Sequence, residues 1–443
     1  MTSTAVPAPS RSQREINRWI QLIAAMIAMM AAANLQYAWT LFTGPFVSSL
    51  HSTLPAIQVA YSTFLIAATW LGPFGGYLID WVGPRRILIF VGVLVGLGWV
   101  GAAEVSTVTQ LIVVYTVGGI GVGIVYAGTV GNAMKWFPDR RGLCVGAIAG
   151  AYGSGTALTV APIASMIKSS GYAHTLHVWG IVQGIVVILA ALVMVHPPLG
   201  WSPAGWKEKQ EANMPKVRTS GVDMTPWQMM RTGCFWLMYL MMVMVAFGGL
   251  MVTAQLSPIA KFYGVDKVTV IFGMYALVLA IQVDRILNGL TRPFWGWVSD
   301  HLGRENSMGI AFTLEALAVF CLLRLVSHPV WFILFSGLCF FAWGEIFSLF
   351  PSITGDLFGE KWATTNYGIV LTAAGVASVF AGPVAAQASV KSGSWVGVFW
   401  AMIVCDLAAA LMALFWLKPV AARTIARAKA GVAATQACRA TED

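Results

Sequence analysis

The chain has 443 residues, of which 58% are hydrophobic and only 10% are charged, and its mean hydropathy is +0.74. Typical soluble domains carry about 25% charged residues, because a folded globule needs a polar surface. The composition therefore excludes a soluble enzyme, a disordered protein and a nucleic-acid-binding module, and it predicts an all-α membrane protein. We assign the net charge of +9 to cytoplasmic loops rather than to a nucleic-acid partner.

Hydropathy predicts twelve membrane helices in chain order, since about 20 apolar residues suffice to cross the hydrocarbon core. Residues 1–18 form a polar N-terminal tail, and the apolar run after them is too long for a signal-peptide core. A polar linker at 197–232 separates an N-terminal six-helix half, 19–196, from a C-terminal half, 233–417, and 418–443 form a tail. The predicted segments are 19–42, 54–79, 87–105, 110–136, 143–167, 175–196, 233–257, 269–297, 307–326, 329–351, 366–390 and 394–417.

The distribution of positive charge predicts the orientation of the chain in the membrane. If the N-terminus is inside, twenty of the 27 lysines and arginines fall in cytoplasmic segments, five fall outside and two lie in the segment 269–297. Lysine and arginine concentrate in cytoplasmic loops of membrane proteins. Both termini are therefore predicted to be cytoplasmic.

A short pattern of glycines and an aspartate occurs twice in the chain. The stretch GYLIDWVG at 76–83 recurs as GWVSDHLG at 296–303, which is an offset of 220 residues. Both copies follow an even-numbered predicted helix on the cytoplasmic side. Two six-helix halves at one constant offset indicate a duplicated unit, which is typical of secondary transporters.

These two copies resemble the loop signature of the major facilitator superfamily, and the resemblance covers essentially the whole chain. It implies two pseudo-symmetric six-helix halves and a cytoplasmic charge network that latches neighbouring helices in one conformation. Such contacts can break when two halves rock against each other. The residues to which the resemblance gives this gating role are Asp80, Arg85, Arg86, Asp300 and Arg304.

Charged side chains inside membrane segments mark a function or a buried pair, because each one costs several kcal/mol in hydrocarbon. The predicted helix 269–297 is the richest in them, and it places Asn288 and Arg292 four residues apart on one face. A guanidinium is permanently charged and grips a carboxylate with two parallel N–H groups. Arg292 therefore predicts an anion site, and the alternative is an arginine paired with Glu345 or Glu315.

Polar and aromatic residues at a similar depth on other predicted helices extend this candidate site. They are Gln36 and Tyr37 on the first helix, Tyr126 on the fourth, and Trp343 and Phe347 on the tenth. Tyrosine and tryptophan present an apolar wall with one hydrogen-bond donor each, which suits a small organic anion. For any single one of them, packing against lipid or a neighbouring helix is the alternative.

Four local sequences look like the oxalate/formate antiporter family, a bacterial relative of the monocarboxylate transporters. They are residues 34–41, 123–126, 136–142 and 292–296. The resemblance implies a multi-pass carrier of small carboxylates in the bacterial inner (cytoplasmic) membrane, functional as a monomer. It also implies that Arg292 is the counter-ion of the substrate.

The sequence departs from that family at one position. The family carries a lysine on helix 11 after an Asn-Tyr-Gly motif, whereas here the motif at 366–368 is followed by Ala374. One fixed cation at Arg292 neutralises a monoanion but leaves a dianion uncompensated in a low-dielectric site. We therefore expect monocarboxylates such as lactate, pyruvate or formate. Arg285 could supply the missing cation, but the adjacent Asp284 is expected to cancel it.

The sequence leaves the remaining alternatives open. Transport is driven by exchange or by proton symport, and the acids that could couple a proton to the substrate are Asp284, Glu345 and Glu315. Oxalate/formate antiport, export of unrelated organic solutes and a sensor that kept the transporter fold are the other interpretations. The six scattered cysteines predict no metal site, and the absence of a nucleophile–base pair or phosphate loop predicts no cofactor and no enzymatic activity.

Overall fold

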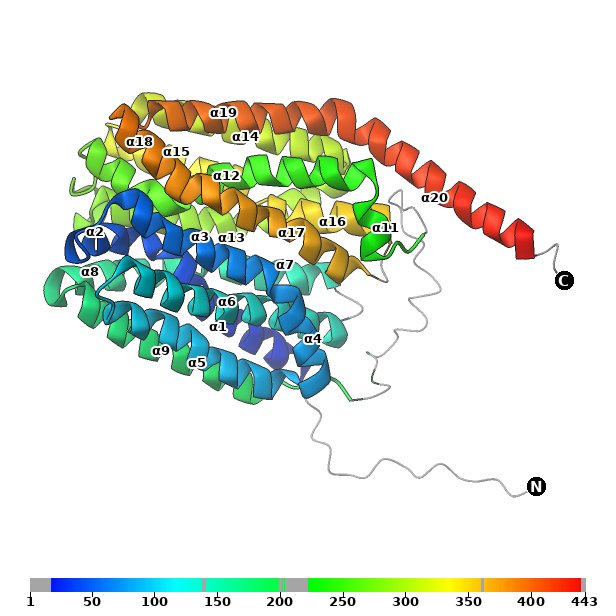
Figure 1. Cartoon of the computed structure of the whole chain (residues 1–443), viewed down its shortest axis with the longest axis horizontal. Helices are drawn as coiled ribbons and strands as arrows, with labels where there is room; N and C mark the ends of the chain where they lie inside the picture. The colour runs from blue at the N-terminus through cyan, green and yellow to red at the C-terminus, as the bar shows by residue number, and fades with distance from the viewer. Residues whose placement is uncertain are drawn as a thin grey trace, which may run out of the picture.

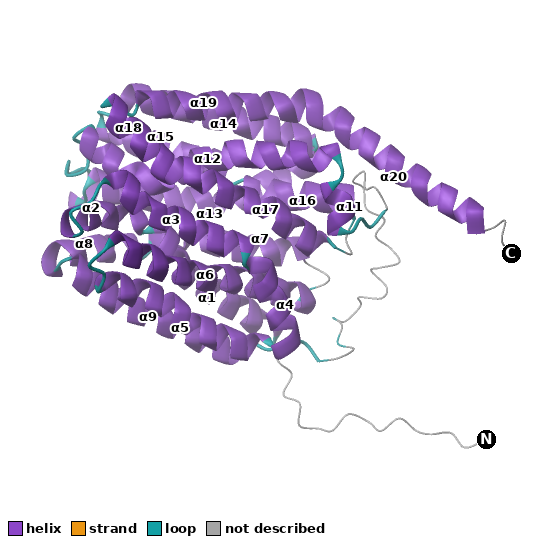
Figure 2. Ribbon diagram, in the orientation of Figure 1, coloured by secondary structure: helices purple, strands orange, loops and turns teal. Residues whose placement is uncertain are grey.

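The protein is a bundle of helices that run side by side (Figure 2). Within the residues that the structure describes, ten helices are long and apolar enough to cross a membrane. Helix Leu54–Trp70 is apolar but shorter, and helix Ala276–Leu302 carries the buried charges Asp284, Arg285 and Arg292. The computed structural model describes residues 17–137, 141–198, 201, 203, 222–359 and 362–439.

The N-terminal half is built from helices α1 to α9. Two of its predicted membrane segments each consist of two helices that share a single joining residue, Ala38 or Leu71. The bounds are α1 (Arg18–Tyr37), α2 (Trp39–Ser49), α3 (Leu54–Trp70), α4 (Gly72–Val82), α5 (Pro84–Ala103), α6 (Val108–Trp136), α7 (Arg141–Ser154), α8 (Val160–Ser170) and α9 (Tyr172–Val193).

The C-terminal half is built from helices α11 to α20. Two π-helical turns, Phe380–Val384 and Met412–Leu417, continue α17 into α18 and α19 into α20. Pro383 lies in the first turn, where its missing N–H prevents a regular helical hydrogen bond. The bounds are α11 (Pro226–Met230), α12 (Gly233–Phe262), α13 (Ala276–Leu302), α14 (Arg304–Leu325), α15 (Pro329–Trp343), α16 (Ile346–Phe358), α17 (Ala363–Val379), α18 (Ala385–Ser392), α19 (Val396–Leu411) and α20 (Lys418–Arg439).

Helix boundaries also differ from the hydropathy segments in the C-terminal half. The segment 269–297 starts too early, because a bridge between Thr269 and Tyr275 and a short 3₁₀ turn precede α13. The segment 329–351 is broken between α15 and α16, and the tail at 418–443 is helical as far as Arg439. Hydropathy averages over a window, so it does not register a break within an apolar run.

The two halves lie side by side, the first drawn in blue to teal and the second in green to red (Figure 1). We call the end of the bundle where α1 begins and α20 leaves the proximal end, and the end where α2 meets α3 the distal end. Between the halves, α3 packs against α17, α7 against α13 and α2 against α12. The central interface therefore draws helices from both halves.

Hydrogen bonds between the halves close the distal part of this interface. The Gln58 amide donates to the carbonyl of Ala254 at 2.9 Å and to Oε1 of Gln255 at 3.0 Å. The Ser62 hydroxyl donates to the carbonyl of Ser378 at 2.7 Å. All of these groups are buried. Breaking the hydrogen bonds between them would leave polar atoms unpaired unless water entered the interface.

The contact between α7 and α13 is a crossing of small residues from opposite halves. A Cβ added at Gly289 would lie 2.8 Å from Cβ of Ser154 and 3.1 Å from the carbonyl oxygen of Gly150. A Cβ at Gly153 would lie 3.0 Å from the carbonyl oxygen of Asn288. Glycine at these positions lets the two backbones approach closely, as small residues do in membrane helix packing.

We expect Gly289→Ala to lower the free energy of unfolding by about 1–3 kcal/mol, because the added methyl group overpacks the crossing. Gly296→Ala, two turns later on α13, is the matched control, since nothing lies within 4 Å of its added Cβ. Thermal unfolding in detergent micelles measures both. Equal midpoints for the two variants would contradict this account of the crossing.

Candidate functional site

Helix α13 places Arg292 at its crossing with α7, with 2% of the residue exposed. Its Nη1 donates to the carbonyl of Ala149 on α7, and its Cζ lies 4.6 Å from the centre of the Phe347 ring. Its Nε and Nη2 have no hydrogen-bond partner. The predicted alternative, an ion pair with Glu345 or Glu315, is absent, because the carboxylate oxygens of both acids also lack partners.

One turn before this arginine, Asn288 joins α13 to a set of polar and aromatic side chains of the N-terminal half. The Asn288 amide donates to the hydroxyl of Tyr37 at 3.3 Å, and the Tyr152 hydroxyl donates to Oε1 of Gln36 at 2.7 Å. The Tyr152 ring lies between those of Tyr37 and Tyr126, with centroids 5.4 and 5.6 Å away. These side chains come from α1, α6, α7 and α13, so they join both halves.

We call the group around Arg292 the central cluster. It brings together most of the residues that the sequence predicts for the anion site and adds Tyr152, which the sequence analysis missed. No charge or motif marks Tyr152 in the sequence, so only the fold reveals it. The central cluster consists of Gln36, Tyr37, Tyr126, Tyr152, Asn288, Arg292 and Phe347.

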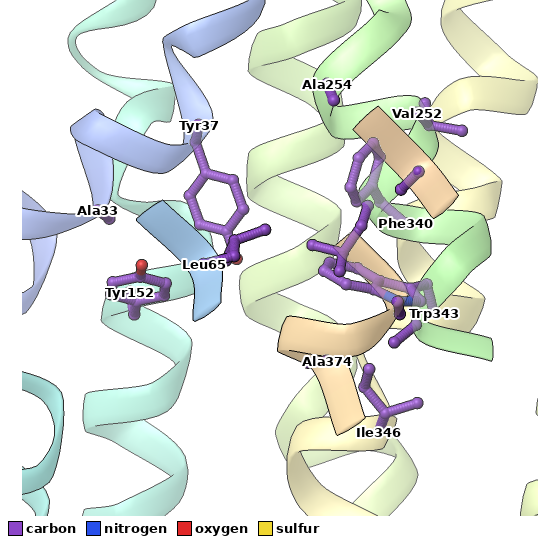
Figure 3. Packing of buried hydrophobic residues seen from close by; sticks show 14 of the residues in the cluster. Ala33, Tyr37, Leu65, Tyr152, Val252, Ala254, Phe340, Trp343, Ile346 and Ala374 are labelled. Atoms are coloured by element: carbon purple, nitrogen blue, oxygen red, sulfur yellow. The ribbon is translucent and has the colours of Figure 1, made fainter. Parts of the chain in front are cut away.

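Trp343 lies next to the central cluster rather than within it. Its ring packs against Phe347 at 5.3 Å, and its indole lies where a Cβ on Gly249 of α12 would be. Figure 3 shows Tyr37 and Tyr152 on one side of the centre and Phe340 and Trp343 on the other. The indole N–H of Trp343 has no hydrogen-bond partner.

Arg285 also reaches the centre of the bundle. Its Cζ lies 4.2 Å from the centre of the Tyr37 ring and 3.9 Å from that of Phe340. Asp284 points elsewhere, since its Oδ1 lies 3.9 Å from the Cβ position of Gly337 on α15. Both carboxylate oxygens of Asp284 lack hydrogen-bond partners, so the two residues form no direct ion pair, although their charges still attract each other through space.

The other acids named as proton-coupling candidates occupy different environments. Glu345 is fully buried at the break between α15 and α16. Glu315 on α14 and Asp406 on α19 both approach Gly248 of α12, with oxygens 2.7 and 3.5 Å from its Cβ position. The fold therefore sets Glu315 beside a second buried acid, not beside Arg292.

At the proximal end, Arg304 connects three segments of the C-terminal half. Its Nη1 donates to Oδ1 of Asp300 at 2.7 Å and also to the hydroxyl of Ser299. Its Nε donates to Oδ2 of Asp356 on α16 at 3.1 Å. Asp356 was missed by the sequence analysis, because its partner lies 52 residues away in the chain.

The corresponding motif of the N-terminal half is described less completely. Arg85 and Arg86 at the start of α5 are exposed. The side chain of Asp80 lies outside the described part of the structure.

The central cluster has the chemistry of an anion site. Its only charged member is a guanidinium with unpartnered N–H groups, and the residues around it offer phenol and amide groups. Among the described residues, no group of three or more histidines, cysteines or acids is arranged to hold a metal ion. The arrangement can bind and orient a small carboxylate by paired hydrogen bonds.

Comparisons with known proteins cover nearly the whole chain. Residues 22–288 and 285–440 match the Major Facilitator Superfamily. The chain is 33% identical to an oxalate:formate antiporter of Oxalobacter formigenes over 401 residues, which are 90% of this chain and 91% of that protein. It is 26% identical to an uncharacterized MFS-type transporter of Escherichia coli K12 over 84% of this chain and 88% of that one.

A human protein named monocarboxylate transporter 14 is 24% identical over 211 residues, which are 47% of this chain and 41% of that protein. The predicted resemblance is thus confirmed at the level of the superfamily and of its carboxylate-transporting relatives. With its apolar helices and a superfamily match across both halves, the chain belongs to the major facilitator superfamily and is a multi-pass membrane transporter, not an enzyme.

Proposed function

We propose that this protein carries small carboxylate anions across the membrane by alternating access, with Arg292 as the counter-ion of the substrate. The observation that carries the proposal is the buried guanidinium of Arg292, which lies between the two halves with two nitrogens unpartnered. An unpaired charge at this depth is costly and marks a functional site. The similarity to an oxalate:formate antiporter supports a carboxylate as the ligand.

The membrane arrangement that we propose has twelve spans with both termini in the cytoplasm of a bacterium. The positive-inside bias and the resemblance to bacterial carriers support insertion in the inner membrane as a monomer. The proximal end then faces the cytoplasm and the distal end faces outward. The hydrogen bonds of Gln58 and Ser62 to the C-terminal half would close the outward path in this conformation.

With Arg292 as the single fixed cation, the substrate that we propose first is a monocarboxylate such as lactate, pyruvate or formate, and the alternative is oxalate/formate exchange, which a second cation would favour. Exchange and proton symport are both compatible with the buried acids. Asp284 and Glu345 are the better candidates for a coupled proton, because Asp284 lies one turn from Asn288 and Glu345 follows Trp343 in the chain. Glu315 is a weaker candidate, because it lies beside Asp406 at Gly248 of α12.

The experiment that tests the function is uptake into proteoliposomes with labelled lactate, pyruvate, formate and oxalate. Each substrate is measured with and without internal counter-substrate and with and without an inward proton gradient. Stimulation by counter-substrate identifies exchange, and stimulation by the proton gradient identifies symport. No uptake of any carboxylate under any condition would refute the proposal.

We expect Arg292→Gln to abolish carboxylate uptake while the protein stays folded, because glutamine keeps hydrogen-bonding groups but removes the charge. Arg324→Gln is the matched control, since that arginine is exposed at the end of α14. Uptake is compared at equal amounts of reconstituted protein. Normal uptake by a well-folded Arg292→Gln protein would remove this residue from the site.

We expect Asp356→Asn to lower turnover several-fold while substrate affinity changes only a few-fold. The substitution weakens the Arg304 contact at the proximal end and so alters a conformational equilibrium, not the anion site. Asp80→Asn in the other half should act in the same direction. Initial rates over a range of substrate concentrations separate the two effects, with Asp266→Asn in the loop before α13 as the control. A large loss of affinity at unchanged turnover would contradict the gating role.

A further inference from the structure

Arg285 is a buried cation that forms no direct ion pair with any of the described residues. Only 2% of the residue is exposed, and its Nε and Nη1 have no hydrogen-bond partner. Its guanidinium lies between the rings of Tyr37 and Phe340, at 4.2 and 3.9 Å. Aromatic faces stabilise a cation, but each contact contributes far less than the cost of burying an unpaired charge.

The neighbouring acid attracts this arginine through space but does not occupy its N–H groups. Asp284 precedes it in the chain, but its carboxylate faces α15 at Gly337 and forms no ion pair with Arg285. A third titratable neighbour, Tyr61 of α3, is within electrostatic range of the guanidinium, and its hydroxyl also lacks a partner. The free N–H groups of Arg285 are therefore available to a ligand.

Arg285 and Arg292 extend from the same helix face toward the centre of the bundle. They are seven residues apart, so they share one face of α13, separated by about 10 Å of helix rise. Their charges interact, and Tyr37 connects them, because its ring contacts Arg285 and its hydroxyl accepts from Asn288. One helix face thus presents two guanidinium groups whose free N–H groups border one cluster of phenols and amides.

We propose that Arg285 is the second cation of the anion site and determines its preference for dianions. A small dicarboxylate would place one carboxylate on Arg292 and the other on Arg285. This inference rests on the proposed function. It replaces the expectation, drawn from Ala374, that a single fixed cation limits the site to monoanions. Ala374 is buried and carries no charge, so a second cation near the site must come from another helix.

Electrostatics gives the size of the change in dianion affinity that a second cation should cause. A second unit charge about 5 Å from an anion, at an effective dielectric near 20, changes affinity roughly a hundredfold. Oxalate and oxamate make a matched pair of ligands, because oxamate has nearly the same shape but replaces one carboxylate by a neutral amide. The ratio of their affinities therefore reports the second cation and cancels effects of size.

The experiment measures binding of oxalate, oxamate and formate to purified protein by calorimetry, with thermal stabilisation as a second readout. We expect the wild type to bind oxalate roughly a hundredfold more tightly than oxamate. Arg285→Gln should bring the ratio close to one while oxamate and formate affinities change only a few-fold. Arg285→Lys should restore part of the preference, and Arg324→Gln should leave it unchanged.

The outcomes separate this inference from the proposed function. Equal oxalate and oxamate affinities in the wild type, or an unchanged ratio in a folded Arg285→Gln protein, would overturn the role of Arg285 and leave the function intact. Where Arg285→Gln does not fold, Arg285→Lys takes its place, because it keeps the charge but loses the guanidinium geometry, and an unchanged ratio together with wild-type affinities for all three anions would then overturn the role of Arg285. If Arg292→Gln binds all three anions as tightly as the wild type, the proposed site itself is wrong.

Discussion

Burial of the Arg292 guanidinium at the contact between the halves is the constraint on which the rest of the arrangement depends. A buried ion without a partner costs several kcal/mol, so the fold can keep it only where surrounding groups and a ligand offset that cost. The carbonyl of Ala149 and the face of Phe347 supply part of the compensation, and they come from different halves. The charge to which we assign anion binding is therefore held by the same contact that joins the two halves.

The glycines at the crossing of α7 and α13 follow from that constraint. Arg292 can reach the Ala149 carbonyl only if the two backbones approach closely, and Gly153 lies with its Cβ position 3.3 Å from Nη2 of Arg292. Small residues on both helices make this approach possible and leave a contact with few interlocking side chains. Such a surface resists separation less than an interdigitated one, which suits a contact about which two halves rock.

The sequence predicted the membrane class and the central residues because their signals are local. Charges within apolar runs mark Arg292 and Asn288, and a repeated loop marks Asp300 and Arg304. Residues recruited from elsewhere in the chain carry no such signal: Tyr152 becomes significant only beside Gln36, 116 residues away.

The direction in which each side chain points is likewise beyond a sequence pattern. Adjacent residues of α13 diverge by about 100° around the helix axis, so Asp284 faces α15 while Arg285 faces Tyr37. Adjacency in the chain therefore does not give the two residues a direct contact, although their charges attract each other through space. The same limit applies to helix breaks such as the one at Gly344, which an average over apolar residues does not register.

The charge balance of the site bears on how transport would be driven. In a carrier with fixed cations at its centre, bound substrate neutralises the site, whereas the empty carrier would have to change conformation with unpaired guanidinium groups in a low-dielectric environment. The empty carrier therefore meets the higher barrier, since the field of a buried charge is weakly screened there. Return with a second anion avoids that barrier, so a site built on Arg292 and Arg285 favours exchange over net uptake unless a buried acid such as Asp284 changes its protonation during the cycle. Proton coupling and exchange are thus two ways of solving one electrostatic problem, and the protonation state of Asp284 in the empty carrier decides between them.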